Sequence, residues 1–152
     1  MSATLTGSAG VKVRRQSFAV QSEGRRQAID ITQRVRDIVQ EAGVHDGLVF
    51  ANCLHTTCSV LVIDSQPELF EDLSHMMGRF VEDECQYKHN DPRLSDCERG
   101  NATAHLRASL LGHGVAIGIS EGELLLGGSQ SILLAEWDGP RPRSVHVQVM
   151  GV

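Results

Sequence analysis

Apolar residues with a helical spacing predict two amphipathic helices in the first half of the chain. In residues 31–42 the apolar positions lie three or four apart. In residues 65–81, Ser65 and Glu68 match a capping box, and Pro67 falls in the first turn, where its missing amide costs nothing. The apolar stripe of this second helix comprises Leu69, Phe70, Leu73, Met76, Met77, Phe80 and Val81.

Continuous apolar runs and alternating patterns predict strands in the rest of the chain. Residues 11–21 mix β-branched residues with arginines, which indicates an exposed first strand. Residues 48–54 are nearly all apolar, which is typical of a strand buried on both faces, and residues 59–64 predict the next strand. Four more strands are predicted at residues 115–119, 123–126, 131–137 and 144–149. In the last of these, valines alternate with polar residues, which indicates one solvent-facing side.

The order of these elements favours one fold class. The helices fall among the strands without alternating strictly with them, which predicts an α+β fold with a mixed, mostly antiparallel sheet or sandwich and two to three helices. Residues 11–152 suffice for a single domain with its own core, and residues 1–10 are predicted to be a flexible tail. Residues 82–99 form a long polar connection, and connections of this length are often functional or mobile.

Composition and charge narrow the classes of partner. The chain has 152 residues and a net charge of -5, which argues against broad nucleic-acid binding. Its apolar runs are too short to cross a bilayer, and its first ten residues lack the apolar core of a secretory signal. The four cysteines form no CxxC pair, so we expect free thiols in a reducing cytoplasm. The sequence therefore predicts a cytoplasmic protein that binds neither nucleic acid nor membrane.

The segment Gly100–His105 begins a third, shorter predicted helix. Asn101 is expected to cap it, because a short amide side chain can accept from the free amides of the first turn. Asn101 and His105 are four residues apart and therefore project from the same helical face. A helix start lined by an amide and an imidazole can hold an anion or a metal. The residues of this helix expected to face inward are Leu106, Leu110 and Leu111.

Two other histidines, His55 and His89, stand near predicted element ends, and we expect them to converge with His105. Neutral imidazoles bind zinc and other transition ions, and a catalytic site keeps one position open for water. A divalent metal, zinc or magnesium, is therefore an expected cofactor. The spacing matches no local metal motif. A phosphate-binding cluster and three unrelated histidines remain the alternatives.

Residues 55–59 place small and polar side chains between two apolar strands. Such a break puts hydroxyl groups at the end of a sheet, where ligands often bind, so Thr56, Thr57 and Ser59 are candidate substrate contacts. The alternative is a bend whose hydroxyls satisfy their own backbone. A nucleophilic pair of Cys58 with His55 is disfavoured, because it needs a geometry that spacing alone does not indicate.

Residues 136–143 end a predicted strand with two carboxylates, Glu136 and Asp138, and two arginines. The planar fork of Arg141 suits phosphate or carboxylate, and the flanking prolines favour an extended arrangement. The alternative is a turn with a surface ion-pair network. Gln130, after a glycine-rich bend, can present an amide to a ligand.

Together these motifs resemble the YjbQ-like family, also called the secondary thiamine-phosphate synthase family. The matching residues are His55-Thr56-Thr57 with Ser59-Val60, Tyr87-x-His89, Asn101-x-x-Ala104-His105-Leu106 with Leu111-Gly112, Gly122-x-Leu124-x-Leu126-Gly127 with Gln130, and Glu136-x-Asp138-Gly139-Pro140-Arg141. Their order and approximate spacing match over about Gly47 to Gly151. The sequence departs from the family at Ser129, where a Trp is usual, at Asp64-Ser65, where Asn-Glu is common, and at Cys58, where a small residue is common.

The resemblance implies an α+β fold that assembles as a homotrimer, with sites near subunit boundaries. It also implies thiamine-phosphate synthase activity, which joins a hydroxymethylpyrimidine diphosphate to a thiazole phosphate and releases pyrophosphate. The alternatives are a non-catalytic trimer that binds a metal or a small phosphorylated metabolite, and a metal-dependent hydrolase.

The implied reaction needs cations or a metal beside the departing pyrophosphate and a polar pocket for the pyrimidine. We expect phosphate contacts from Lys88 and Arg141, and substrate orientation by Asn101 and Gln130. The three histidines would hold a metal or donate to the leaving group. Glu136 or Asp138 would position a histidine or accept a proton.

Overall fold

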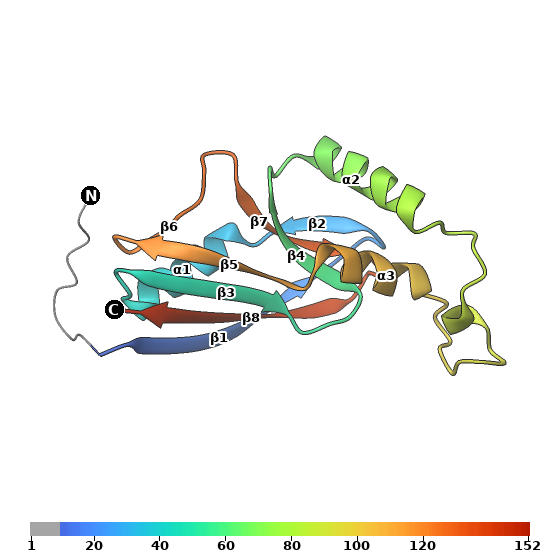
Figure 1. Cartoon of the computed structure of the whole chain (residues 1–152), viewed down its shortest axis with the longest axis horizontal. Coiled ribbons are helices and arrows are strands. Elements are labelled where there is room, and N and C mark those ends of the chain that lie inside the picture. The colour runs from blue at the N-terminus through green and yellow to red at the C-terminus, as the bar shows by residue number, and fades with distance from the viewer. Residues whose placement is uncertain (1–9) are drawn as a thin grey trace.

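A computed structural model of the chain describes residues 10–152, so the tail predicted for residues 1–10 lies almost wholly outside the described residues. The largest element is sheet A, whose five strands pair antiparallel (Figure 1). In spatial order the strands are β1 (Lys12–Gln21), β8 (Pro142–Gly151), β3 (Gly47–Cys53), β5 (Gly114–Ser120) and β6 (Glu123–Leu124). In β8 the predicted alternation is present, because Arg143, Val145, Val147 and Val149 are buried while the residues between them are more exposed.

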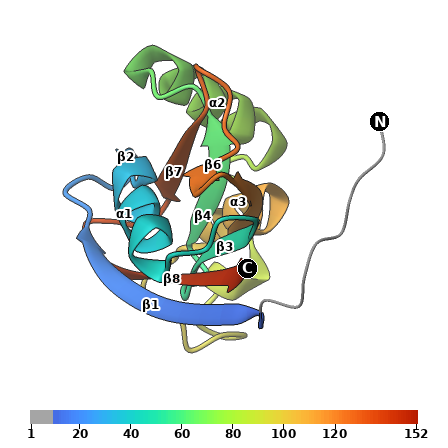
Figure 2. The same cartoon turned by 90° about the vertical axis from the view of Figure 1, so that its left-hand side faces the viewer.

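Sheet B is smaller and lies across the core from sheet A. Its antiparallel strands, in spatial order, are β2 (Gln27–Asp30), β7 (Ser131–Glu136) and β4 (Cys58–Ile63). Helix α1 (Thr32–Ala42) lies between the two sheets (Figure 2). Its buried residues Val35, Ile38 and Val39 pack in one cluster with Val49 of β3 and Leu134 of β7. This cluster is the main hydrophobic core.

Two further helices, α2 (Pro67–Phe80) and α3 (Ala102–Leu111), cover the opposite face of sheet B. Their second, smaller core consists of Met77, Ala104, Ala108, Ala135 and Trp137. Strand β7 is therefore buried on both faces, since it contributes to both cores. The connection between the two helices contains the 3-10 turn η1 (Lys88–Asn90).

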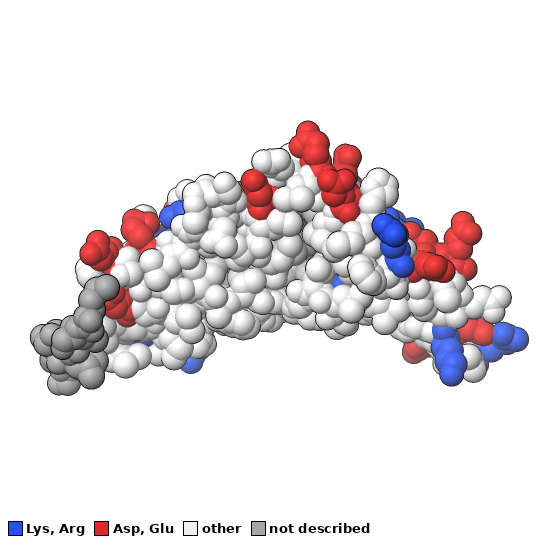
Figure 3. Space-filling view, turned by 45° about the horizontal axis from the view of Figure 1, so that its top comes forward, with Lys and Arg blue, Asp and Glu red and all other residues white. Residues whose placement is uncertain are grey.

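The architecture is α+β, as the sequence predicts, with mostly antiparallel strands and three α-helices in the described residues. Between residues 10 and 152, no helix combines the length and apolarity needed to cross a bilayer. Acidic residues gather along one edge of the molecule (Figure 3), and α2 contributes the exposed residues Glu68, Glu71 and Asp72 to the surface.

The predicted inward face of α3 is wrong in part. Leu106 and Leu110 are 42% and 63% exposed, whereas Ala104 and Ala108 are buried against sheet B. Small side chains let the helix backbone approach the sheet closely, and this outweighs the larger apolar area of the leucines.

The side-chain contacts at the starts of α2 and α3 also differ from the predicted helix caps. Helix α2 begins at Pro67, and the preceding residue makes no side-chain cap, so the predicted capping box of Ser65 is absent. Asn101 precedes α3 but does not cap it through its side chain. Asn90 replaces it, because the Oδ1 atom of Asn90 accepts the backbone N–H of Ala102 at 3.0 Å. The long connection is thereby tied to the start of α3.

The outer face of sheet A is not covered by any described element, and it carries an apolar cluster next to polar residues such as Arg15 and Gln148. Leu48 and Phe50 of β3 are 40% and 43% exposed, so the prediction that this strand is buried on both faces is wrong. In the strand register, Leu48 lies opposite Met150, which lies opposite Val13, and both are also exposed. Helix α1 covers only the other face, behind the sheet in the view of Figure 1.

Candidate functional site

The end of β3, the start of β8 and the first turn of α3 enclose a cleft of about 490 Å³, here called the main cleft. Six predicted site residues line it: His55, Thr56, Thr57, Asn101, His105 and Arg141. Leu54, Pro142 and Arg143 complete the lining. Among the described residues, the lining thus contains two arginines and two histidines but neither Asp nor Glu. The exposed guanidinium of Arg141 can attract an anion to this lining.

A buried ion pair between Glu136 and Arg143 forms the floor of the main cleft. Both side chains are almost fully buried, and the Arg143 guanidinium donates two hydrogen bonds to the carboxylate, one of them from Nε at 2.6 Å. Burial alone would raise the pKa of Glu136, but the hydrogen bonds from Arg143, Asp138 N–H and Ser22 lower it. Arg143 also donates to Thr57 Oγ1 at 2.8 Å, so the pair fixes the turn that carries the cleft hydroxyls.

A second buried carboxylate, Asp138, gathers the polar groups at the rim. It accepts hydrogen bonds from Arg99 Nε and Asn101 Nδ2, both at 2.9 Å, and from Arg141 at 3.3 Å. Burial opposes ionisation, but the bonds from Arg99 and Asn101 outweigh it and lower the pKa of Asp138. Asp138 therefore orients Arg141, whose side chain remains 39% exposed to the cleft and solvent. No histidine in residues 10–152 is hydrogen-bonded to Glu136 or Asp138, so neither positions an imidazole directly.

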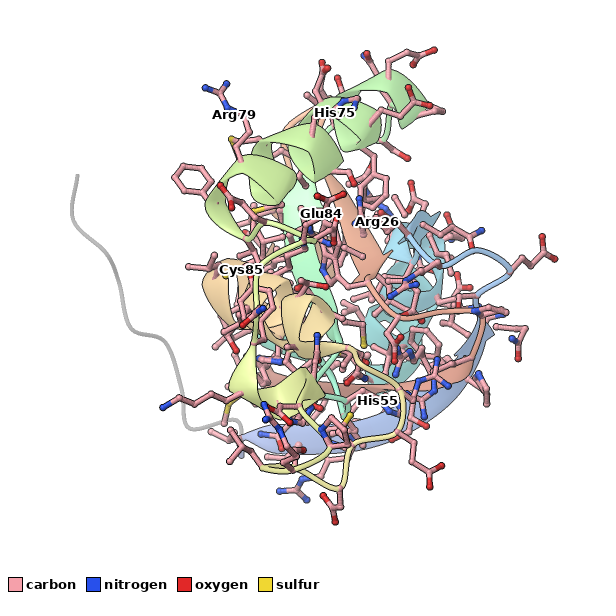
Figure 4. The ribbon with its side chains drawn as sticks, turned by 90° about the vertical axis from the view of Figure 1, so that its right-hand side faces the viewer. Arg26, His55, His75, Arg79, Glu84 and Cys85 are labelled. Atoms are coloured by element: carbon pink, nitrogen blue, oxygen red, sulfur yellow. The ribbon has the colours of Figure 1, made fainter. Side chains whose placement is uncertain are left out.

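His55 is held as a neutral imidazole of defined tautomer. Its Nε2 atom accepts the backbone N–H of Ser144 at 2.8 Å, which places the remaining ring proton on Nδ1. Burial lowers the pKa of His55, and the nearby charges of Arg143 and Arg141 lower it further. His55 lies beside the loop coloured yellow in Figure 4, whereas His75 and Arg79 belong to α2 at the opposite side of that view. The Nδ1–H group is the one that can donate to a ligand.

His105 and His89 lie side by side, with ring centroids 5.0 Å apart and planes nearly perpendicular. Burial lowers the pKa of His105, and so does the neighbouring His89, while Asp138 and the Thr56 backbone favour its protonated form. Within residues 10–152, no three His, Cys, Asp or Glu side chains are grouped to hold a metal. Nε2 of His55 is also engaged by a backbone amide. The three histidines therefore do not fit the predicted metal site within one chain.

His105 also borders a second cavity of about 350 Å³, here called the apolar hollow, so this residue lines both the apolar hollow and the main cleft. The other residues of the apolar hollow are Tyr87, Lys88, His89, Ala102 and Leu106. Tyr87 is fixed by its hydroxyl, which donates to the Glu82 carbonyl at 2.7 Å. Lys88 and His89 thus lie at the apolar hollow rather than in the main cleft.

Two predicted substrate contacts lie away from both cavities. Ser59 is fully buried, where its Oγ accepts Trp137 Nε1–H at 3.2 Å, so it anchors the second core. Gln130 precedes β7 at the end of that strand remote from the cleft, and its Oε1 accepts the backbone N–H of Gly127 at 2.8 Å. Six residues of extended strand, about 20 Å, separate Gln130 from Glu136.

Three residues that matter here were not among the predicted site residues: Arg143, Arg99 and Asn90. Arg143 is in phase with Val145, Val147 and Val149, and this alternation indicated that its side chain points inward. Arg99 and Asn90 come from the long connection, where no periodic pattern indicates the direction of a side chain.

Comparisons with known proteins agree with this geometry at the level of fold and family. The family model described as "UPF0047 protein YjbQ-like" matches residues 16–152. A UPF0047 protein of Archaeoglobus fulgidus is 39% identical over 122 residues, covering 80% of this chain and 90% of that protein. A UPF0047 protein of Methanothermobacter thermautotrophicus is 31% identical over 141 residues, covering 93% and 94%. A solved structure from Sulfolobus solfataricus, titled a YbjQ-like protein of unknown function, superposes with a TM-score of 0.86 at 31% identity, covering 94% of this chain and 100% of that one.

Proposed function

The chain belongs to the YjbQ-like UPF0047 family, and from this premise we propose that its main cleft binds the phosphate or diphosphate of a small molecule. The observation that carries the proposal is the exposed guanidinium of Arg141 in a lining that has no acidic side chain among the described residues. Arginine presents a planar fork of donors that matches phosphate oxygens.

The donors in the main cleft differ in how firmly they are held. Arg141 is oriented by Asp138, and His55 offers Nδ1–H because its Nε2 is engaged. Asn101 is fixed through its Nδ2 to Asp138, and Thr56 is an exposed residue of the lining. Groups that are already oriented lose little freedom when an anion binds, which favours binding.

The enzymatic form of the proposal is the thiamine-phosphate synthase reaction. In it, the bond between the pyrimidine methylene and the diphosphate breaks, and a bond to the thiazole nitrogen forms. Arg141 would stabilise the charge on the departing pyrophosphate, and His105 would contact it or orient the pyrimidine. This mechanism uses the chain's own cations, since the histidines do not group into a metal site within one chain.

Binding of inorganic pyrophosphate to the purified protein tests the site before any reaction is assayed. Arg141→Ala should weaken binding about ten- to a hundredfold, because each hydrogen bond to a charged group contributes ~1.5–3 kcal/mol. Arg79→Ala, on α2 and away from the cleft, is the matched control (Figure 4). Equal affinity in wild type and Arg141→Ala, measured by titration calorimetry, would refute the proposal.

A non-catalytic binder is the second candidate, and one observation favours it. Both buried carboxylates near the cleft are engaged: Glu136 by Arg143 and Asp138 by Arg99 and Asn101. The cleft lining thus offers no free carboxylate as a base among the described residues. Formation of thiamine phosphate by wild type and its loss in His105→Ala would support the enzyme. Pyrophosphate binding without turnover would support the binder.

We further propose that the protein assembles as a homotrimer through the outer face of sheet A. That face presents Leu48, Phe50 and Met150 to solvent next to polar residues, and exposed apolar clusters with a polar rim mark interaction surfaces. Light scattering should give three times the chain mass of 16.5 kDa, and Phe50→Glu should reduce it. A wild type with the mass of one chain would contradict this assembly.

The free thiols of all four cysteines support the proposal of a cytoplasmic location.

A further inference from the structure

We propose that Cys53 and Cys58 form a redox-active dithiol, which a peroxide closes to an intrachain disulfide that alters the turn carrying His55. Cys53 ends β3 of sheet A, and Cys58 begins β4 of sheet B. Both are buried free thiols, and only the four residues Leu54 to Thr57 separate them. All four of these residues line the main cleft, so the dithiol joins the two ends of one cleft wall.

The Cys53 side chain already lies against the residue to which it would be bonded. Its Sγ atom donates to the backbone oxygen of Cys58 at 3.1 Å and lies 3.7 Å from the backbone oxygen of His55. The two thiols also hydrogen-bond to each other. Such a close approach of two cysteines is the geometric requirement for a disulfide.

The two sulfurs differ in acidity, as expected for the attacking and the resolving thiol of a redox pair. The hydrogen bond from the Cys58 thiol lowers the pKa of Cys53 against the effect of burial, and the His55 backbone and the positive charge of Arg143 lower it further. The same hydrogen bond, together with burial, raises the pKa of Cys58. Cys53 is therefore the sulfur that attacks first, while Cys58 stays protonated beside it.

Hydrogen peroxide is the oxidant, and it is small enough to reach a sulfur beside an open cleft. The Cys53 thiolate attacks one peroxide oxygen, the O–O bond breaks, and a sulfenic acid and hydroxide form. The Cys58 sulfur then attacks the Cys53 sulfur, the S–O bond breaks, and the disulfide forms with release of water. The hydroxide recovers the proton that Cys53 had lost. Two thiols and one peroxide thus give one disulfide and two waters.

Oxidation removes a hydrogen bond that holds the turn. A disulfide sulfur carries no proton, so the backbone oxygen of Cys58 loses the Cys53 thiol as its donor. The turn also contacts β8, because His55 Nε2 accepts the backbone N–H of Ser144 at 2.8 Å. A shift of the turn loosens this contact. The imidazole that offers Nδ1–H to the main cleft is thereby placed under redox control, and in a reducing compartment such a disulfide is transient.

Mapping of thiols by mass spectrometry tests the disulfide. Cys85→Ser is the starting protein, because the exposed Cys85 thiol is itself open to peroxide. After peroxide, unfolding and alkylation, Cys53 and Cys58 should be linked, with the loss of two hydrogens, and Cys97 should be alkylated. Dithiothreitol should restore all three thiols. Adding Cys58→Ala should abolish the link, whereas adding the matched control Cys97→Ser should leave it. Retention of both buried thiols, at a peroxide concentration that oxidises Cys85 in wild type, would overturn the proposal.

Hydrogen exchange at the Ser144 amide tests the effect on the turn. Exchange there should be on the order of three- to tenfold faster in the oxidised protein and should return to its first rate after reduction. The amide of Val149, further along β8 and paired with both β1 and β3, is the internal control and should not change. An unchanged rate at Ser144 in protein shown to be oxidised would overturn the redox control of the cleft. Neither measurement uses a phosphate ligand, so both are independent of the proposed function.

Discussion

Replacing Glu136 with Gln should cost several kcal/mol of folding free energy, because this carboxylate accepts five buried hydrogen bonds. Oε2 accepts Arg143 Nε at 2.6 Å and Ser22 Oγ at 2.9 Å. Oε1 accepts the backbone N–H groups of Trp137 and Asp138 at 3.0 and 2.9 Å, and the second Arg143 donor. A Gln side chain has one acceptor oxygen, and its amide nitrogen would face donors in either orientation.

Removing one partner of a buried ion pair costs about 3–5 kcal/mol, because the other charge stays buried. Domains are stable by about 5–15 kcal/mol, so Glu136→Gln should remain folded but with a large loss. For a chain of this length each kcal/mol shifts the melting temperature by ~2–4 °C. The melting temperature should therefore fall by on the order of 10 °C.

Urea unfolding followed by circular dichroism at one fixed protein concentration measures this loss. Glu123→Gln is the control, since Glu123 pairs with Arg36 at 3.5 Å on the surface, where such pairs contribute at most about 1 kcal/mol. A loss below about 1 kcal/mol in Glu136→Gln, with an unchanged slope against urea, would show that the buried pair does not stabilise the fold as inferred.

The dependence of folding stability on acidic pH should also report on the Glu136 carboxylate. Burial opposes ionisation, but the bonds from Arg143, Asp138 N–H and Ser22 lower the pKa of Glu136 below its ordinary value of 4.5. A carboxylate whose pKa is lowered by folding stabilises the protein above its unfolded pKa, and the contribution is lost as pH falls through the folded pKa. The difference between wild type and Glu136→Gln should therefore shrink as pH falls below about 4.5.

Two further predictions concern the start of α3. Asn90→Ala should cost about 1 kcal/mol and speed hydrogen exchange in the first turn of α3, because it removes the acceptor of the Ala102 N–H; unchanged exchange there would contradict the capping role. Burial, together with His89, lowers the pKa of His105, and a bound anion should raise that pKa again. Anion binding should therefore be coupled to proton uptake, and the affinity should increase as pH falls from 8 to 5.5. Sulfate is the suitable probe because its charge is constant in this range, and His105→Asn should reduce the gain; a pH-independent affinity in wild type would count against His105 contacting the anion.

Much of the fold could be predicted because it depends on local periodicity. The alternation in β8 and the apolar spacing in α1 report directly which face meets the core. The inward face of α3 could not be predicted from the size of its apolar residues, because close approach selects Ala104 and Ala108 over the leucines.

The site was partly predictable for a related reason. Residues at the ends of strands and at a helix start, such as His55, Arg141 and His105, meet in the main cleft. The partners that define their chemistry lie far along the chain or belong to the backbone. The tautomer of His55 is fixed by the backbone N–H of Ser144, which is 89 residues away in sequence. Because this contact uses the backbone, the type of side chain at position 144 does not indicate it.

The position of Asp138 has a consequence for how long a ligand stays. Its carboxylate already accepts from Arg141 and Arg99, so it acts as an internal substitute for the anion. An incoming phosphate must share or take over Arg141, and a departing one is replaced at once by Asp138. The guanidinium is therefore never left unpaired while the phosphate departs, which favours fast release and rapid exchange over long-lived capture.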